Sequence, residues 1–261
     1  MSIVTLTTDF GTRDGYVAQM KGILLSRGPA DLRIVDLSHA IPPQSVRDAA
    51  YFLRHAVPRF PPDTIHVVVV DPGVGSARRP VVVRSHGQLL VGPDNGVFGW
   101  LLKGDEEAFV LDADPLGLPE PSATFHGRDL FAPSAATFAT GIPPERLGLA
   151  PVEEPLHRLK WPVALVESRR VRGEVVHVDR FGNLISNITE PAVSGLQGEV
   201  HVRIGHGESV TLHDTYSAVR VGEPLALYGS EGLLEVAVRE GDAAKRLDAR
   251  VGDDVEVTCR G

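Results

Sequence analysis

The sequence predicts an α/β protein in two domains: an N-terminal α/β layered domain with a central, mostly parallel sheet and a C-terminal all-β barrel. In residues 1–155, apolar strand patterns alternate with amphipathic helix patterns. A proline-rich segment then interrupts this alternation. Short strand patterns with glycine-rich turns follow it over residues 163–261, with no long helix between them.

The N-terminal elements follow from their apolar periodicity and their bounding turns. Residues 65–70 (IHVVVV) form a β-branched run between Pro61-Pro62 and Asp71-Pro72-Gly73, which is typical of a central strand covered on both faces. A helix is expected over 45–57 with Ser45 as its N-cap. We also expect strands at Ile3–Thr8, Arg33–Asp36, Val81–Arg84 and Gln88–Gly92, and helices at Tyr16–Arg27 and Gly127–Thr140.

Prolines mark the boundary between the two domains. They stand at positions 143, 144, 151, 155 and 162, a density that indicates a linker. The strands expected beyond it are Val175–Val178, Glu199–Ile204, Ser209–Leu212, Leu225–Tyr228, Leu233–Val238 and Asp254–Thr258.

Composition and charge argue against several classes of protein. The formal net charge is −8 and no cluster of Lys and Arg offsets it, which disfavours a nucleic acid partner. No apolar run reaches the ~18 residues of a membrane span, and the first residues lack the pattern of a signal peptide. Cys259 is the only cysteine, which leaves neither an internal disulfide nor a cysteine zinc site. We expect a cytoplasmic protein that binds neither nucleic acid nor membrane.

Polar clusters follow predicted strands of the N-terminal domain, and open α/β sheets bind ligands at such strand ends. Asp9 ends a buried strand pattern, and its carboxylate could accept ribose hydroxyls or hold an ammonium. Asp14 could do the same, or it could cap the helix that follows.

Two further N-terminal clusters admit both a functional and a structural interpretation. The loop DPGVGSARR, residues 71–79, could cradle phosphates, or it could be a glycine turn with surface arginines. It is neither a P-loop nor GxGxxG, which argues against a kinase or Rossmann site. His126 and Asp129 precede a helix, where a lone histidine is more often structural and an aspartate can favour the helix dipole.

A metal-dependent phosphohydrolase could use Asp9, Asp71, His126 and Asp129 as ligands. However, no HExxH spacing is present and these acids lie far apart in the sequence.

Two segments of the C-terminal domain are also candidates. In the segment 179–187, Asp and Asn side chains could read an amine and a nucleobase edge, and Phe181 could stack on a ring. The alternative is a β-turn with its usual polar residues. Residues 228–232 (YGSEG) could equally form a plain hairpin.

Taken together and in order, these clusters resemble the S-adenosylmethionine hydrolase family, also called SAM hydroxide adenosyltransferases, the water-using relatives of fluorinase and chlorinase. The matching segments run from residue 7 to about residue 238: TTDFGTRDGYVAQMKG, VVDPGVGSARR, VGPDNGVF, TFHGRDLFAPSAA, VDRFGNLISNI, TYSAVRVGEPLAL and GSEGLLEVAV. The resemblance implies an α/β domain followed by a β-barrel. It also implies a homotrimer whose ligand lies between the first domain of one subunit and the barrel of the next.

The resemblance also implies a role for each matching residue. Asp71, Arg78 and His126 match the family's catalytic set, and Asp9 matches the carboxylate on the ribose hydroxyls. Around the other parts of the substrate, the matches are Asp14 and Asp179 near the methionine ammonium, Phe181, Asn183 and Tyr216 around the adenine, Ser230 and Glu231 in the loop at the methionine carboxylate, and Val238 in the strand whose backbone meets the base.

The reacting centre indicates water, not halide, as the nucleophile. Halide-using relatives have Tyr-Pro-Ala-Thr where this chain has Asp71-Pro72-Gly73-Val74, and Tyr-Ser where it has His126-Gly127. They also carry an insertion after that loop, and an arginine where Glu231 stands here. The resemblance therefore implies hydrolysis of S-adenosyl-L-methionine at C5′ to adenosine and L-methionine, with no metal and no cofactor. The alternatives are a non-catalytic SAM- or adenosine-binding regulatory protein and a halogenase-like enzyme.

Overall fold

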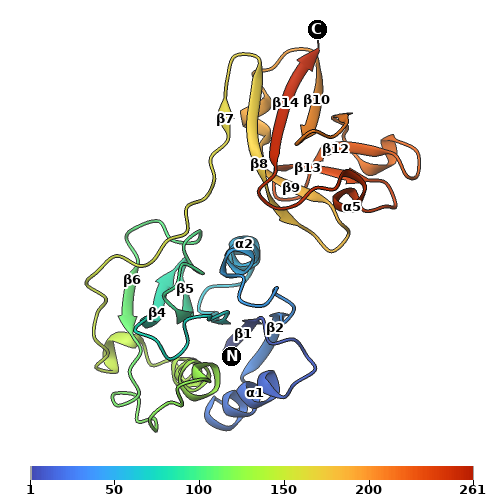
Figure 1. The fold of residues 1–261 in the computed structure, drawn as a ribbon. Coiled ribbons are helices and arrows are strands. Elements are labelled where there is room, and N and C mark those ends of the chain that lie inside the picture. Colours follow the sequence, from blue (N-terminus) through green and yellow to red (C-terminus); the bar gives the residue numbers. More distant parts are fainter. Residues whose placement is uncertain (1, 261) are drawn as a thin grey trace. The chain divides into compact units, whose positions relative to one another are not determined.

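The structure is a computed structural model that describes residues 2–260, and the chain divides into two compact units between Lys160 and Trp161. Figure 1 labels many of their elements. The first unit mixes helices with strands and the second consists largely of strands, so the predicted α/β class is confirmed.

The first unit is built on one six-stranded sheet of order β2-β1-β3-β5-β4-β6. Three pairs of neighbouring strands are parallel: β2 with β1, β1 with β3, and β3 with β5. In contrast, β4 pairs antiparallel with both β5 and β6. The sheet is therefore mixed, because β4 and β5 form a hairpin through His86 and Gly87, both of which have positive φ. The strands are β1 Ile3–Thr8, β2 Arg33–Ser38, β3 Ile65–Val69, β4 Pro80–Ser85, β5 Gln88–Pro93 and β6 Glu107–Val110, of which β6 was not predicted.

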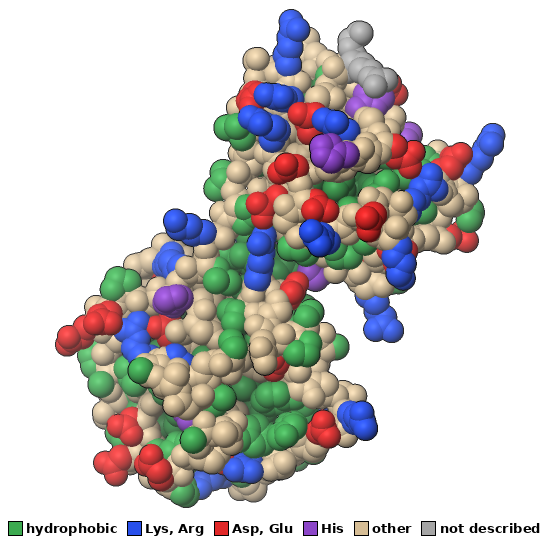
Figure 2. All heavy atoms as spheres, viewed as in Figure 1, with side chains coloured by type: hydrophobic (Ala, Val, Ile, Leu, Met, Phe, Trp, Pro, Cys, Tyr) green, Lys and Arg blue, Asp and Glu red, His purple; other side chains and the backbone are tan. Residues whose placement is uncertain are grey.

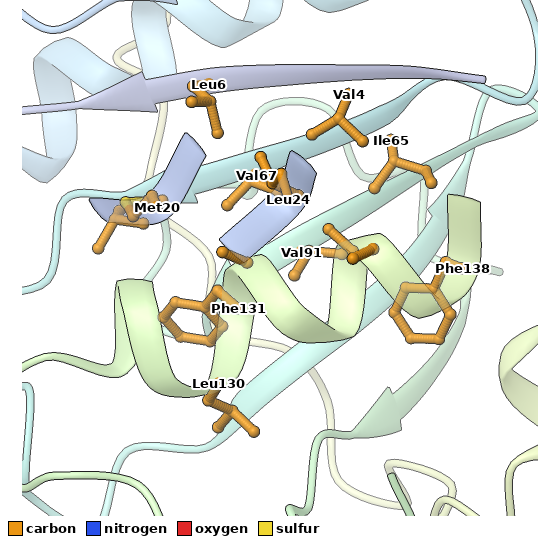
Figure 3. Close-up of a cluster of buried hydrophobic side chains, with 14 of the residues drawn as sticks. Val4, Leu6, Met20, Leu24, Ile65, Val67, Val91, Leu130, Phe131 and Phe138 are labelled. Atoms are coloured by element: carbon orange, nitrogen blue, oxygen red, sulfur yellow. The ribbon is translucent and has the colours of Figure 1, made fainter. Parts of the chain in front are cut away.

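Two hydrophobic clusters cover the two faces of this sheet. Val67 packs with α1 Tyr16–Arg27 and α3 Ala132–Ala139, and Figure 3 shows that cluster around Met20 and Phe131. Its neighbour Val68 packs with α2 Val46–Ala56 on the other face. This alternation is the period of a strand, and β3 is buried along its whole length. The prediction of a central strand covered on both faces is confirmed.

The N-termini of α1 and α2 test the two predicted helix caps. Ser45 is the N-cap of α2 and accepts a hydrogen bond from the backbone N–H of Asp48, as predicted. The helix cap suggested for Asp14 is wrong: α1 has Gly15 at its N-cap and no side-chain cap.

The helix predicted at 127–140 has two parts. A π-helix, η2 Gly127–Phe131, leads directly into α3. Pro133 has no N–H to donate to the carbonyl four residues earlier, and Ala132 donates to the carbonyl of Gly127, five residues earlier.

The second unit is one eight-stranded antiparallel sheet of order β11-β10-β14-β8-β9-β13-β12, with β7 paired to β8. A bridge between Leu212 and Ala226 joins its two ends, so the sheet is nearly closed and barrel-like. The strands are β7 Leu165–Val166, β8 Arg170–Val178, β9 Leu184–Thr189, β10 Glu199–Ile204, β11 Ser209–Thr211, β12 Pro224–Tyr228, β13 Leu233–Val238 and β14 Asp254–Arg260. The short helices of the chain are η1 Val57–Arg59, η3 Pro144–Arg146, α4 Glu190–Val193, η4 Tyr216–Ala218 and α5 Ala243–Leu247.

The end of the proline-rich segment is fixed to the first unit. Arg79 donates to Asp94 Oδ2 at 2.6 Å and to the carbonyl of Pro155 at 2.9 Å. The other oxygen of Asp94 accepts the N–H of His157 at 2.7 Å. These bonds hold residues 155–157 against the strand ends of the sheet, so this part of the predicted linker belongs to the first unit.

Among residues 2–260, no helix is long and apolar enough to cross a membrane. On the face shown in Figure 2, basic and acidic side chains are interspersed.

Buried His66 makes the stability of the fold depend on pH. His66 Nδ1 lies 2.7 Å from Thr5 Oγ1 on the neighbouring strand, and burial lowers the pKa of the imidazole from 6.5 to about 4. Between these pH values the unfolded chain binds a proton that the folded chain does not bind. The free energy of unfolding should therefore decrease as the pH falls from 6.5 towards 4, by on the order of 3 kcal/mol from this group.

Urea denaturation at pH 7 and pH 4 measures this contribution. His66→Gln should make the pH dependence shallower, whereas His206→Gln, at an exposed position, should leave it unchanged. The same pH dependence in the wild type and in His66→Gln would show that His66 does not contribute.

Candidate active site

The fold brings Asp71, Arg78 and His126 together at the strand ends of the first unit. Arg78 Nε lies 3.0 Å from both carboxylate oxygens of Asp71, and Arg78 Nη2 also donates to Asp71 Oδ2. The same Nη2 lies 2.8 Å from His126 Nδ1. The Asp71 and Arg78 side chains are only 4% and 9% exposed. One buried guanidinium thus joins a carboxylate to an imidazole.

The loop from Asp71 to Arg78 is held by backbone turns and by close contacts. The N–H of Val74 bonds to the carbonyl of Asp71 and that of Ser76 to the carbonyl of Gly73, so these two donors are used within the loop and are not free for phosphate. Gly75 has φ +76°, and a Cβ there would lie 2.5 Å from the carbonyl oxygen of Ala123. Only glycine lets this loop approach the segment that carries His126.

Asn95, just after β5, fixes the residue that precedes the site. Its side-chain amide donates to the carbonyl of Val70 at 2.9 Å, and its Oδ1 accepts the N–H of Val97 at 3.2 Å. Val70 stands directly before Asp71. Asn95 therefore sets where the chain leaves β3 and where the Asp71 side chain begins.

Burial and Arg78 both favour the neutral imidazole of His126. Burial, followed by the positive charge of Arg78, lowers the pKa of His126, while Asp71 and Asp129 act in the opposite direction. Because a guanidinium only donates hydrogen bonds, His126 Nδ1 must accept, and the ring proton of the neutral imidazole is on Nε2. His126 is then a donor at its other nitrogen.

One nitrogen of the Arg78 guanidinium makes no hydrogen bond within the described residues. Its Nη1 is buried and has no hydrogen-bond partner among residues 2–260, while its Cζ lies 5.5 Å from the centre of the Phe131 ring. The ring contact stabilises the cation on its apolar side.

A pocket of about 340 Å³ opens beside this set. Asp9 lies in it, and its Oδ2 accepts the N–H of Gln44 at 2.7 Å. Its other lining residues include Asp71, His126, Phe10, Phe125 and Val69. Gln44 was not anticipated, because it comes from the segment after β2 and only the fold brings it to Asp9. Phe125 precedes His126, and an aromatic residue beside a candidate histidine was the one available signal.

Asp129 and Asp14 lie outside this pocket. Asp129 accepts hydrogen bonds from Arg128 Nε at 2.6 Å and from Ser122 Oγ at 2.5 Å, and Arg128 is the main cause that lowers the pKa of Asp129 to about 2. Asp129 thus ties the start of η2 to the preceding loop. Asp14 is exposed in the turn before α1. Among residues 2–260, no group of three or more His, Cys, Asp or Glu side chains is arranged to hold a metal.

The second unit has a pocket of its own, of about 520 Å³. Phe181, Asn183, Tyr216 and Val238, all singled out from the sequence, line it together with Glu240, Gly241 and Asp242. The Phe181 side chain is 74% exposed, so its ring face is open for stacking.

Asp179 shapes the turn that presents two of these residues. Its Oδ1 accepts the N–H groups of Phe181 and Asn183, both at 2.9 Å, and its Oδ2 accepts the Asn183 side-chain amide at 3.0 Å. The segment is therefore a polar turn, and the same turn places Phe181 and Asn183 in the pocket.

Glu235 is a buried acid that the sequence interpretation missed. It is 7% exposed, and its Oε1 accepts the hydroxyl of Tyr216. Burial raises the pKa of both groups. A single acid within the apolar strand pattern LLEVAV was the available signal. Ser230 and Glu231 are exposed in the β12–β13 turn, where Gly229 N–H bonds to the carbonyl of Leu233, so this segment is a hairpin.

A buried carboxylate and guanidinium meet a partly buried imidazole beside a pocket at the strand ends of an α/β sheet, the place where enzymes of the open α/β class bind their ligands. Residues 4–148 match the family model for the SAM hydroxide adenosyltransferase N-terminal domain, and residues 173–256 match that for its C-terminal domain. The chain belongs to the SAM hydroxide adenosyltransferase family.

Relatives match over nearly the full length of the chain. A protein from Thermus thermophilus named "(R)-S-adenosyl-L-methionine hydrolase" is 44% identical, covering 98% of this chain and 100% of its own. A "Fluorinase" from an Actinoplanes species is 27% identical over 98% of this chain and 97% of its own. The crystal structure of an uncharacterized conserved protein from Thermotoga maritima has a TM-score of 0.87 and 35% identity, and the match covers 99% of this chain and 100% of that one.

We predict that the His126 imidazole titrates below the usual value of 6.5 and that Arg78→Gln raises its pKa, because the substitution removes the second largest cause of the shift. An NMR titration of the imidazole signals, with His126→Gln to assign the resonance, measures both values. Arg79→Gln is the matched control, since Arg79 pairs with Asp94 outside the pocket. An unchanged His126 pKa in Arg78→Gln would contradict the assigned contact.

Proposed function

We propose that this protein hydrolyses S-adenosyl-L-methionine. Water attacks C5′ in line with the departing sulfonium, which gives adenosine and L-methionine. The observation that carries the proposal is the hydrogen-bonded network of Asp71, Arg78 and His126 beside the pocket, in a chain 44% identical to a protein named as such a hydrolase.

The chemistry of the leaving group limits what the site must supply. The methionine sulfur leaves as a neutral thioether, so no general acid is needed. No phosphate charge develops, so the proposed reaction uses neither metal nor cofactor. What the reaction requires is a water molecule positioned for attack in a pocket that excludes other water.

The hydrogen bonds of the network favour Asp71 as the group that takes the proton from this water. His126 Nδ1 accepts from Arg78, which leaves Nε2–H to donate to the water oxygen. The carboxylate of Asp71 has lone pairs beyond those that Arg78 uses, and it is the remaining acceptor in the set. Arg78 orients Asp71 and places its positive charge next to the developing hydroxide.

The substrate-binding roles follow the family resemblance. We assign Asp9, in the pocket of the first unit, to the ribose hydroxyls. The adenine is assigned to Phe181, Asn183, Tyr216 and Val238. The fact that these four residues line one pocket of the second unit supports this assignment. Asp14 and Asp179 are assigned to the methionine ammonium, and Ser230 and Glu231 to the loop at its carboxylate. Asp179 also shapes its own turn through three hydrogen bonds, and its carboxylate has acceptor capacity beyond them.

We also propose a homotrimer in which each site combines the first unit of one subunit with the second unit of the next. The division of the assigned residues between two separate units supports this arrangement. The single cysteine fits a cytoplasmic location.

Product analysis after incubation with SAM, with and without added chloride or fluoride, tests the reaction. Adenosine and methionine are the expected products in every case. Halogenated adenosine as the main product would overturn the choice of water, and the recovery of intact SAM would indicate a non-catalytic binder.

Asp71→Asn should lower kcat by about 10²–10⁴-fold, because the amide keeps the shape of the side chain but cannot take a proton. KM for SAM should change little. Asp94→Asn is the control, since Asp94 also pairs with an arginine but stands outside the pocket. Undiminished turnover in Asp71→Asn would remove Asp71 from its assigned role.

Subunit mixing tests the shared site. Asp71→Asn and Phe181→Ala change different units, so co-refolding equal amounts should restore about a quarter of the sites with random association. Asp71→Asn mixed with Arg78→Gln, both in the first unit, should restore none. Equal activity in the two mixtures would show that each site lies within one subunit.

A further inference from the structure

We propose that His39 is a positioning residue for the Asp9 carboxylate and that it acts through the hydroxyl of Thr8. The inference rests on the proposed role of Asp9 at the ribose. Neither His39 nor Thr8 is assigned a role in the proposed function, although Thr8 directly precedes Asp9 in the matching segment TTDFG.

Parallel pairing brings His39 and Thr8 together. Thr8 is the last residue of β1, and His39 directly follows β2, the parallel neighbour of β1. Thr8 Oγ1 lies 2.9 Å from His39 Nδ1, and both residues are buried, with His39 only 8% exposed.

The neighbouring groups favour one direction for this hydrogen bond. His39 Nε2 lies 3.1 Å from Asp36 Oδ1, and Lys21 Nζ holds the other oxygen of Asp36 at 2.5 Å. A carboxylate beside Nε2 favours the ring proton on that nitrogen, which leaves Nδ1 to accept from the Thr8 hydroxyl. The Thr8 oxygen in turn accepts the N–H of Phe10 at 3.3 Å, and this bond closes a turn around Asp9.

A second contact of His39 reaches the chain on the other side of Asp9. The carbonyl of His39 accepts the N–H of Gly11 at 2.8 Å, where φ of +66° lets the chain turn. The Asp9 carboxylate itself accepts the N–H of Gln44, farther along the segment that follows His39. His39 therefore fixes the residues on both sides of Asp9 and sets how its carboxylate enters the pocket.

The same strand provides an internal control. Thr5 Oγ1 lies 2.7 Å from His66 Nδ1, and both residues are fully buried. This bond also joins a threonine hydroxyl to a histidine Nδ1, with Thr5 on the same strand three residues before Thr8 and His66 on β3. It contacts no part of the Asp9 turn, so loss of the Thr5–His66 bond should reduce stability without altering the pocket.

The expected effect is on substrate binding. Thr8→Val frees the N–H of Phe10 and the ring of His39, so Asp9 is no longer held in one orientation. We expect KM for SAM to rise about tenfold, with kcat within about twofold of the wild type, because a hydrogen bond that orients a charged group is worth about one order of magnitude. Thr8→Ser, which keeps the hydroxyl, should restore KM. Thr5→Val should leave KM and kcat unchanged.

Variants of the imidazole give a second and independent comparison. His39→Leu should raise KM as Thr8→Val does. His39→Gln can still accept from the Thr8 hydroxyl and should recover most of the loss. The Thr8→Val/His39→Leu double variant should raise KM no more than either single change, since both break the same bond. If Thr8→Val does not fold, the two His39 variants still carry the test.

The Asp9→Asn background separates this proposal from the proposed function. If His39 acts through Asp9, adding Thr8→Val to Asp9→Asn should not raise KM further. Equal KM values for Thr8→Val and Thr5→Val, with Asp9→Asn itself raising KM, would overturn the positioning role. An Asp9→Asn variant with wild-type KM would instead overturn the assignment of Asp9 to the substrate.

Discussion

The guanidinium of Arg78 is the constraint on which the first unit's site depends, because a charge that is nine-tenths buried must be paired. Its partners come from the end of β3 and the start of η2, so these segments must meet at one point. Gly75 permits the close approach of the loop, and Asn95 fixes the end of β3. The same guanidinium fixes which nitrogen of His126 carries the proton. Packing and chemistry are therefore set by one side chain.

Periodicity predicted the elements whose environment is uniform along their length. β3 is apolar on both faces because helices cover both faces of the sheet. The helix α2 begins after Ser45 because the Ser45 hydroxyl can accept a hydrogen bond from the N–H of Asp48, which has no partner within the helix. An element was missed where its residues also belong to a polar motif. β9 begins directly after the polar turn 179–183, so its residues were assigned to a candidate site. The π-helix before α3 was also missed. It lies next to Pro133, which has no N–H for a helical hydrogen bond, and an apolar pattern does not show such a local change of helix type.

Within the polar motifs, sequence spacing could not separate chemical residues from scaffolding residues. Arg78 and Arg79 are adjacent, yet one joins Asp71 to His126 and the other fixes residues 155–157 through Asp94. His126 lines the pocket, whereas Asp129 ties down a loop. The strand-end rule located the region correctly because parallel strands finish at one edge of a sheet. The partner of each side chain depends on segments far apart in the chain, which is why Gln44 and Glu235 emerged only from the fold.

The contacts of Arg79 and Asp94 with residues 155–157 determine the shortest fragment that can contain the complete first unit. The N-terminal family match ends at residue 148, but a fragment ending there would lack the segment that these two side chains hold. Both neighbour the site, since Arg79 follows Arg78 and Asp94 precedes Asn95. A separately expressed first unit therefore has to extend to Lys160, where the compact unit ends. The boundary for expression follows hydrogen bonding and not the limits of sequence similarity.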